Sequence, residues 1–370
     1  MRLGTVFLMP IFVASILVSA PAQTQKAKEN DDVIRVDTQL VDVPIAAIGP
    51  GGRPVRDLKK NNFVIYEDGK QQTIENFSAT AAPFEIALVL DTSGSTRSDL
   101  QLIKKAAQDF VQSLRTGDRV SISAFNSGHK DGQTTAVSEV LSALTDDRTK
   151  LRSAIDAASN SFGTPYYDSI LQVAETIFRD PPRDQFRGRR ALVALTDGVD
   201  STSLSDFAEV KEKLQKMGIV CFFIKVDTRE FFESGLLGDC KSATRFSVAQ
   251  IRRYYRSLNA KANIEKAVNF CELGDFERLA VSKQLYGIAD GEMNELAKKS
   301  GGRVFPAADL SEARVAFKSV AEEIGTQYTL GYYSSNEKRD GTYRRIKVEL
   351  KGLPAGIQIR SREGYTAPAN

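Results

Sequence analysis

Between residues 84 and 324, short apolar runs alternate with longer segments whose apolar residues have helical spacing, and this alternation constrains the fold most strongly. Residues 84–90 form a nearly continuous apolar run, which is typical of a strand covered on both faces. The next segment carries apolar residues at intervals of three and four, which predicts a helix ending near Gly117. A strand followed by such a helix is the repeating unit of α/β sheets.

The same alternation continues along the chain. Further strands are predicted at residues 119–125, 191–195 and 219–226, and further helices at residues 148–158, 167–178 and 204–217. Regular alternation implies parallel strands with helices on both faces of the sheet. We therefore predict a doubly wound, mostly parallel α/β domain over residues 83–326.

The alternation breaks between about residues 229 and 290, which predicts an insertion in this domain. It resumes with a predicted helix at 293–299, a strand at 303–305 and a helix at 311–324. Within the insertion, the run Arg252-Arg253-Tyr254-Tyr255-Arg256 could contact an acidic partner. A solvated helix face with packed tyrosines is the more common arrangement for such a run.

Both ends of the chain have a different pattern. Residues 33–82 and 327–370 show the broken alternation of apolar and polar residues that is typical of half-buried strands. Neither end alone carries enough strands to be stable. We therefore predict one β-sandwich-like domain in which the two ends pair, preceded by a flexible polar leader at residues 23–32.

The first 22 residues have the pattern of a signal peptide. Arg2 is followed by an apolar stretch, and Ala20-Pro21-Ala22 supplies small residues for cleavage. An uncleaved anchor is the alternative, although Pro10 and the short length of the stretch disfavour a membrane span. We expect a periplasmic or secreted protein with no stable membrane span after cleavage.

Three cysteines leave an odd one in an exported chain. Cys221 lies in an apolar run and is predicted to be a buried strand residue, where a thiol behaves as a small hydrophobe. Cys240 and Cys271 could pair in an oxidising compartment or stay reduced, because their spacing alone does not establish the geometry of a disulfide.

The charge balance and the residue inventory narrow the function. With 50 basic and 47 acidic residues, the net charge of +3 provides no field that would hold nucleic acid. His129, the single histidine, is predicted to lie exposed in a polar loop. The sequence has neither a Gly-x-Ser-x-Gly elbow nor a phosphate-binding Gly-x-x-x-x-Gly-Lys loop. We therefore do not expect an enzyme.

Oxygen-bearing side chains follow three of the predicted strands or precede the helices behind them. These residues are Asp91, Ser93, Ser95, Thr164 and Asp197. Ligands of open α/β sheets bind at the carboxyl ends of the strands, where such loops meet. Carboxylate and hydroxyl oxygens suit Mg²⁺ or Ca²⁺ better than a soft transition metal.

Each of these groups also has an ordinary explanation. Serine and threonine before a helix are common N-caps, and an aspartate followed by glycine after a strand is a common turn. All three loops in order, each at the end of a strand, favour a metal site over three unrelated caps. The sequence predicts a site for Mg²⁺, with Ca²⁺ or Mn²⁺ as possible substitutes.

The run Asp91-Thr92-Ser93-Gly94-Ser95 resembles the Asp-x-Ser-x-Ser signature of von Willebrand factor type A domains. Thr164 matches the family's single threonine, and Asp197 matches its later aspartate. The stretches 63–69, 163–168, 327–333 and 362–365 further resemble the acidobacterial VWFA-related subfamily. The resemblance implies a metal-ion-dependent adhesion site, in which hydroxyls bind Mg²⁺ directly, aspartates act largely through water, and a carboxylate of a partner protein completes the coordination.

These expectations lead to one leading function and two alternatives. The leading function is an exported, non-catalytic, adhesion-type module that binds a partner protein through Mg²⁺. A metal-dependent hydrolase is the first alternative, although the chain offers little imidazole for acid–base chemistry. An envelope structural protein with a vestigial metal site is the second.

Overall fold

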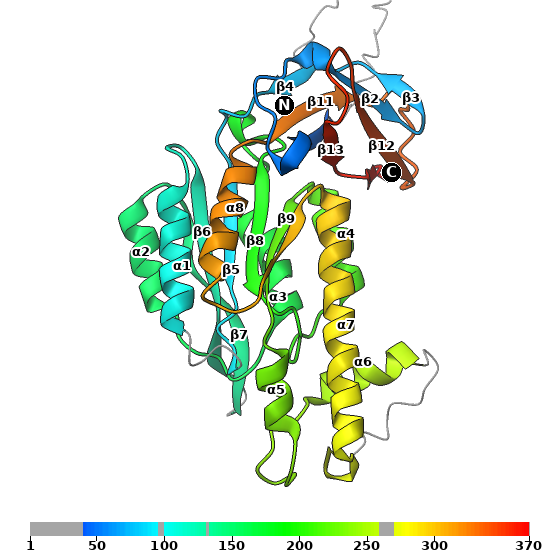
Figure 1. The fold of residues 1–370 in the computed structure, drawn as a ribbon. Helices are drawn as coiled ribbons and strands as arrows, with labels where there is room; N and C mark the ends of the chain where they lie inside the picture. The colour runs from blue at the N-terminus through cyan, green and yellow to red at the C-terminus, as the bar shows by residue number, and fades with distance from the viewer. Residues whose placement is uncertain (1–39, 95–99, 131–132, 259–269, 370) are drawn as a thin grey trace, which may run out of the picture. The chain divides into compact units, whose positions relative to one another are not determined.

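The computed structural model describes residues 40–94, 100–130, 133–258 and 270–369. Their central element is a six-stranded sheet with the strand order β10-β9-β8-β5-β6-β7 (Figure 1). Its strands are β5 (Glu85–Leu90), β6 (Arg119–Lys130), β7 (Gln133–Thr145), β8 (Arg190–Thr196), β9 (Val220–Val226) and β10 (Arg303–Ala307). All neighbouring strands are parallel except β6 and β7, which are antiparallel. The predicted α/β fold class is confirmed.

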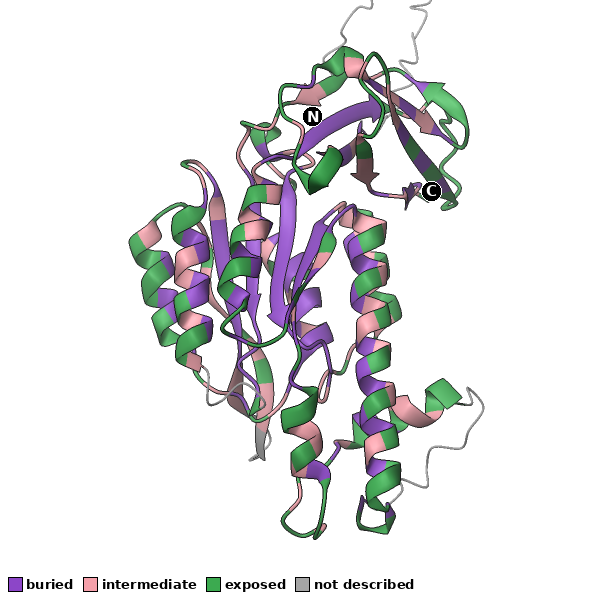
Figure 2. Ribbon diagram, in the orientation of Figure 1, coloured by how far each residue is buried: buried purple, intermediate pink, exposed green. Residues whose placement is uncertain are grey.

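Helices cover both faces of this sheet. Ile86, Leu88 and Leu90 of β5 pack in one core with α1 (Leu100–Ser113), α2 (Arg148–Ala157) and α8 (Ala313–Ile324). Ala87 and Val89 face a second core with α3 (Tyr166–Gln172), α4 (Phe207–Met217) and α7 (Asp275–Ser300). Figure 2 shows the central strands buried along their length. Two covered faces explain why these strands have nearly continuous apolar sequences.

The structure differs from the sequence prediction at one edge of the sheet. No strand was predicted at residues 133–145, where β7 pairs with β6 as an antiparallel edge strand. From Thr135 onward, the described residues of β7 are partly or fully exposed. An exposed strand needs no regular apolar face, so apolar residues such as Val137 do not alternate strictly with polar ones. This pairing also extends β6 to Lys130, so that His129 lies in a strand and not in the predicted loop.

A second difference concerns the end of the insertion. The helix predicted at 293–299 is the last part of α7, which begins at Asp275. The first part of α7 packs its apolar residues against the insertion, while Met293 and Leu296 pack against the sheet. The helix therefore continues through the position where the sequence pattern suggested a boundary.

The two ends of the chain form two small antiparallel sheets, ordered β13-β1-β11-β4 and β14-β12-β2-β3. The strands are β1 (Leu40–Ile48), β2 (Phe63–Glu67), β3 (Lys70–Gln72), β4 (Asn76–Ser78), β11 (Tyr328–Tyr333), β12 (Tyr343–Leu350), β13 (Gln358–Ser361) and β14 (Gly364–Thr366). N-terminal β1 pairs with C-terminal β11, and β2 pairs with β12. Side chains of both sheets share one apolar core. The exact domain boundaries at residues 82 and 326 stay a prediction.

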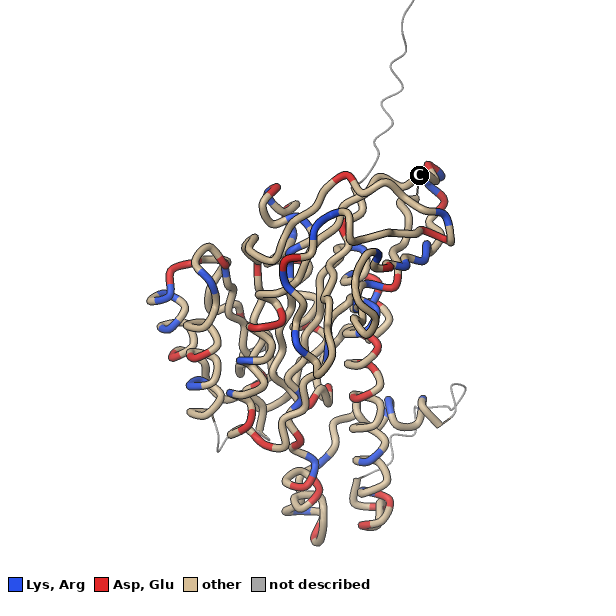
Figure 3. Tube along the Cα trace, turned by 45° about the horizontal axis from the view of Figure 1, so that its top comes forward, with Lys and Arg blue, Asp and Glu red and all other residues tan. Residues whose placement is uncertain are grey.

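Charges are distributed evenly along the described chain. Lysine and arginine interleave with aspartate and glutamate along the trace (Figure 3). Within the described residues, no helix combines the length and the apolar character needed to cross a membrane. The predicted signal peptide and leader lie outside the described residues.

Candidate functional site

Asp91 and Asp197 follow two neighbouring strands of the central sheet. Strands β5 and β8 are parallel and pair Leu90 with Leu195, so the two aspartates emerge at the same edge. The amide of Asp91 donates to the carbonyl of Leu195 (2.9 Å). Both aspartates are buried. The topology thus brings together two of the predicted ligands from positions more than a hundred residues apart in the sequence.

The carboxylate of Asp91 is held in place by hydrogen bonds from neighbouring residues. Its Oδ1 accepts a hydrogen bond from the amide of Ser93 (3.0 Å), and its Oδ2 accepts one from the hydroxyl of Thr196 (2.7 Å). The Thr196 hydroxyl in turn accepts from the amide of Gly198 (2.8 Å). These hydrogen bonds fix the orientation of the carboxylate at the edge of the sheet.

The carboxylate of Asp197 is held in a similar way. Its Oδ1 accepts from the amide of Val199 (2.9 Å), and its Oδ2 accepts from the hydroxyl of Thr228. Since Thr228 donates its one proton to Asp197, the hydroxyl of Tyr286 donates to Thr228 (2.9 Å between oxygens). A chain of hydroxyls therefore connects Asp197 to α7 of the insertion.

Burial makes the charged forms of these two aspartates costly. Burial and, as a smaller cause, the neighbouring charge of Asp91 together raise the pKa of Asp197 to about 7. Burial also raises the pKa of Asp91, although hydrogen bonds from Ser93 and Thr196 act in the opposite direction. Two buried carboxylates that repel each other are an arrangement that a bound cation would stabilise.

The predicted hydroxyl ligands lie near these carboxylates. Ser93, Thr164 and Asp197 line one pocket of about 520 Å³. Thr164 is positioned by Ser201, whose hydroxyl accepts from the amide of Thr164 (2.8 Å) and whose amide donates to its carbonyl (3.0 Å). Ser95, the remaining predicted ligand, lies outside the described residues.

The donor set fits a hard divalent cation. The described residues contain no cluster of three or more histidine, cysteine, aspartate or glutamate side chains arranged to hold a metal. The oxygen donors at this edge are instead two carboxylates and the neighbouring hydroxyls, and waters could complete the coordination of a cation. Oxygen-only coordination with several waters is what Mg²⁺ prefers in proteins.

Three supporting residues escaped the sequence analysis. Thr196, Thr228 and Tyr286 do not belong to the predicted ligand set, yet they orient its two carboxylates. The sequence did hold a signal for Thr228, which follows β9 by two positions at the same edge of the sheet. Tyr286 had no such signal, because only the packing of α7 brings it to Asp197.

The insertion forms one side of the pocket. It contains α5 (Arg229–Leu236), α6 (Val248–Leu258) and the first part of α7, drawn beyond the end of β8 in Figure 1. Phe232 and Phe246 pack against each other, with ring centroids 5.8 Å apart, and both line the pocket. The insertion is therefore part of the site, in contact with the edge of the sheet that carries the predicted ligands.

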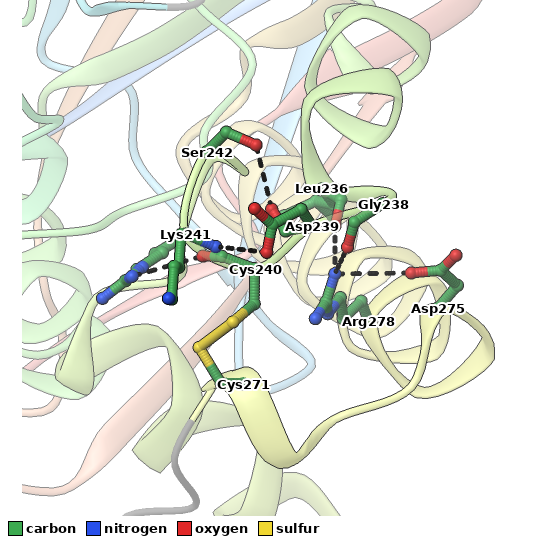
Figure 4. Close-up of a disulfide and its surroundings, with 10 residues drawn as sticks. Leu236, Gly238, Asp239, Cys240, Lys241, Ser242, Cys271, Asp275 and Arg278 are labelled. Atoms are coloured by element: carbon green, nitrogen blue, oxygen red, sulfur yellow. Dashed lines mark hydrogen bonds and ion pairs between the residues drawn. A yellow bond between two sulfur atoms is a disulfide. The ribbon is translucent and has the colours of Figure 1, made fainter.

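A disulfide joins two parts of the insertion (Figure 4). Cys240 and Cys271 are bonded, with Cα atoms 5.2 Å apart, which resolves the alternative that the sequence left open. Arg278 of α7 is buried nearby and donates to the carbonyls of Leu236 (2.9 Å) and Gly238 (3.0 Å). Arg278 ties the end of α5 and the loop after it to α7, and the disulfide ties the same loop to the short turn before α7. Cys221, in contrast, is a free, buried thiol in β9, as predicted.

The run of basic and aromatic residues belongs to α6. Tyr254 and Tyr255 pack against the apolar core of the insertion. Arg253 forms an ion pair with Glu292 of α7 and lies 4.7 Å from the ring centroid of Tyr167. These contacts fit the packed helix face better than a free basic patch.

The comparison with protein families agrees with this geometry. Residues 86–199 match the model of the von Willebrand factor type A domain. The chain contains a von Willebrand factor type A domain. Such domains are protein-binding modules, usually non-catalytic, and often bind a divalent metal. No functionally curated protein matches the chain.

Several solved structures are similar to this chain. The conserved hypothetical protein BatB from Bacteroides thetaiotaomicron is 16% identical, with a TM-score of 0.39, over 65% of this chain and 97% of that chain. A von Willebrand factor type A protein from Catenulispora acidiphila is 12% identical, with a TM-score of 0.42, over 90% and 75%. Proximal thread matrix protein 1 from the mussel byssus is 14% identical, with a TM-score of 0.41, over 73% and 50%.

Proposed function

We propose that this chain is an exported, non-catalytic module that binds a partner protein through a divalent cation. The cation is Mg²⁺, with Ca²⁺ or Mn²⁺ as substitutes, and its ligands are Asp91, Ser93, Ser95, Thr164 and Asp197. The partner contributes a carboxylate. The observation that carries this proposal is the meeting of two buried aspartates at neighbouring strand ends, beside a pocket that Ser93 and Thr164 also line.

The charge of the site explains its preference for an acidic partner. Two aspartates balance the two positive charges of the cation, and the hydroxyls add none. Because its remaining ligands are neutral hydroxyls and waters, the cation stays electrophilic enough to attract an anionic ligand. Ser93 and Thr164 would hold the cation through their hydroxyls, while the fixed carboxylates of Asp91 and Asp197 would orient its waters.

Other parts of the proposal rest on separate features. The disulfide between Cys240 and Cys271 supports a periplasmic or secreted location, because disulfides persist in oxidising compartments. The stretches 163–168 and 327–333 support membership of the acidobacterial VWFA-related subfamily. Within the described part of the chain, Arg253 is ion-paired, which makes the insertion's basic run a poor partner site of its own.

The test is thermal unfolding of the mature chain in MgCl₂ and in EDTA. A ligand that binds the folded state alone raises the melting temperature by mass action. Wild type is expected to melt higher in MgCl₂, and Asp197→Asn is expected to lose this difference. Asp200→Asn is the matched control, since Asp200 is equally buried and also has a pKa raised to about 7 by burial, but lies off the pocket.

Two results would contradict the proposal. Equal melting temperatures in MgCl₂ and EDTA would favour an envelope structural protein with a vestigial site. Turnover of ester or phosphate substrates that EDTA abolishes would favour a metal-dependent hydrolase.

A further inference from the structure

We propose that the insertion makes this site selective for an acidic residue with an aromatic neighbour in the partner protein. The inference rests on the proposed function, because it assigns the carboxylate of that acidic residue to the cation. It adds a second contact, between the aromatic neighbour and the insertion.

The pocket has two walls of different origin. Thr164 and Asp197 belong to the edge of the central sheet, whereas Phe231, Phe232 and Phe246 belong to the insertion. A volume of about 520 Å³ is larger than one carboxylate needs and falls in the range of pockets that hold whole ligands. The space beside the predicted cation is thus lined by aromatic rings.

Two of the aromatic residues are largely exposed to solvent. Phe231 is 62% exposed on α5, and Phe162 is 72% exposed on the loop before Thr164. Both line the pocket, Phe231 from the insertion and Phe162 from the loop that carries Thr164. Aromatic side chains that stay exposed around a polar centre are typical of protein-binding surfaces.

The charge of the insertion wall also favours an acidic segment. Asp197 and Arg245 are the charged residues among the described residues that line the pocket. Arg245 is exposed, and it donates to the carbonyl of Cys240 (3.2 Å) while its charge stays unneutralised by that contact. Arg245 therefore adds a positive charge opposite the open coordination position of the cation, and an acidic peptide complements both.

The insertion wall is held in place before any partner binds. The disulfide between Cys240 and Cys271 fixes the loop that carries Arg245, and Arg278 ties the end of α5 to α7 (Figure 4). Phe232 also packs against Tyr286, with ring centroids 6.3 Å apart. Because this side of the pocket is already ordered, binding of a partner would cost less conformational entropy.

The experiment measures binding of short fluorescein-labelled peptides to the mature chain by anisotropy, in MgCl₂ and in EDTA. The probes have glycine ends and a central Asp-Phe or Phe-Asp pair. Their controls carry Asp-Ala, Ala-Asp or Asn-Phe at the centre. We expect at least one aromatic probe to bind roughly tenfold more tightly than its alanine control in MgCl₂.

Paired variants test the insertion wall. Phe231→Ala is expected to weaken binding of the aromatic probe roughly tenfold and to leave binding of its alanine control unchanged. Its matched control is Phe276→Ala, because Phe276 is 92% exposed on α7 and does not line the pocket. Arg245→Gln should weaken binding of both probes. Arg252→Gln should weaken binding of neither, because Arg252 is exposed on α6 and does not line the pocket.

The outcomes separate the inference from the proposed function. Equal, Mg²⁺-dependent binding of Asp-Phe and Asp-Ala probes would overturn the aromatic contact and leave the cation site standing. Absence of binding by every probe would also overturn the inference, since the cation site is measured independently by thermal unfolding. Binding that persists in EDTA, or with Asn-Phe, would contradict both.

Discussion

At the residue scale, the surroundings of Asp197 show how the site holds a buried carboxylate. Its carboxylate is buried, lies near that of Asp91, and accepts from a backbone amide and from Thr228. Removing a donor from such a carboxylate leaves it less stabilised as an anion. Residues that orient a metal ligand from behind commonly change metal affinity tenfold or more.

Thr228→Val is therefore expected to weaken Mg²⁺ binding roughly tenfold. Valine keeps the shape of threonine but removes the hydroxyl that links Tyr286 to Asp197. Calorimetric titration with MgCl₂ gives the affinity. Thr326→Val is the control, since Thr326 is also buried but bonds only to carbonyls of α8. Wild-type affinity in Thr228→Val would show that Thr228 plays no part in cation binding.

A second residue-scale prediction concerns Gly302. A Cβ atom there would lie 1.9 Å from the carbonyl oxygen of Cys221, in the backbone of β9. Gly302→Ala is therefore expected to destabilise the fold by more than about 3 kcal/mol, measured by urea unfolding. Gly287→Ala in α7 is the control, because nothing lies within 4 Å of the added atom. It should stabilise the helix by about 0.5–1 kcal/mol.

At the scale of elements, the insertion is the part that the sequence could predict least. Runs at residues 84–90 and 219–226 were found because both faces of those strands are covered, which leaves a continuous apolar sequence. Strand β7 was missed because it is an exposed edge. Helix α7 was cut short because its two halves pack in different cores, and no local pattern records that.

Reduction of the disulfide tests the role of the insertion as a separate element. Loss of the bond between Cys240 and Cys271 is expected to cost about 2–4 kcal/mol of stability. Mg²⁺ binding should persist, because the cation ligands lie at the ends of central strands. Unfolding and MgCl₂ titration with and without dithiothreitol measure both effects. The Cys240→Ser, Cys271→Ser double variant should show no further response to dithiothreitol.

At the scale of the whole molecule, the sequence predicted the order of strands and helices better than the side-chain contacts that support the site. The α/β class followed from the alternation of strands and helices, and the pairing of β1 with β11 joins the two ends as a small sheet. Asp91 and Asp197 emerge at one edge because the parallel strands β5 and β8 end there. Ser93, Thr164 and Asp197 line one pocket at this edge, with Thr164 contributed by the loop before α3. Support of the two aspartates by Thr196 and Tyr286 depends on side-chain packing, which spacing in the sequence does not encode.

The buried carboxylates predict how stability depends on pH. Burial raises the pKa of Asp197 and of Asp200 from 3.8 to about 7 in the folded chain. The folded state therefore holds protons that the unfolded state releases, so stability without metal should fall as pH rises from about 4 to about 7. Stabilisation by Mg²⁺ should grow over the same window, because protons compete with the cation. Melting temperatures in EDTA and MgCl₂ across this range measure both trends. Asp197→Asn should abolish the Mg²⁺ trend and reduce the trend in EDTA, part of which remains with Asp200.

The cation site is tested most directly by anomalous diffraction from crystals of the mature chain grown with MnCl₂, since Mn²⁺ occupies oxygen sites of the Mg²⁺ kind. We predict one strong anomalous peak at the edge of the central sheet, beside Ser93, Thr164 and the carboxylates of Asp91 and Asp197. Crystals of Asp91→Ala should lack this peak. A peak elsewhere, or full occupancy in Asp91→Ala, would contradict the account.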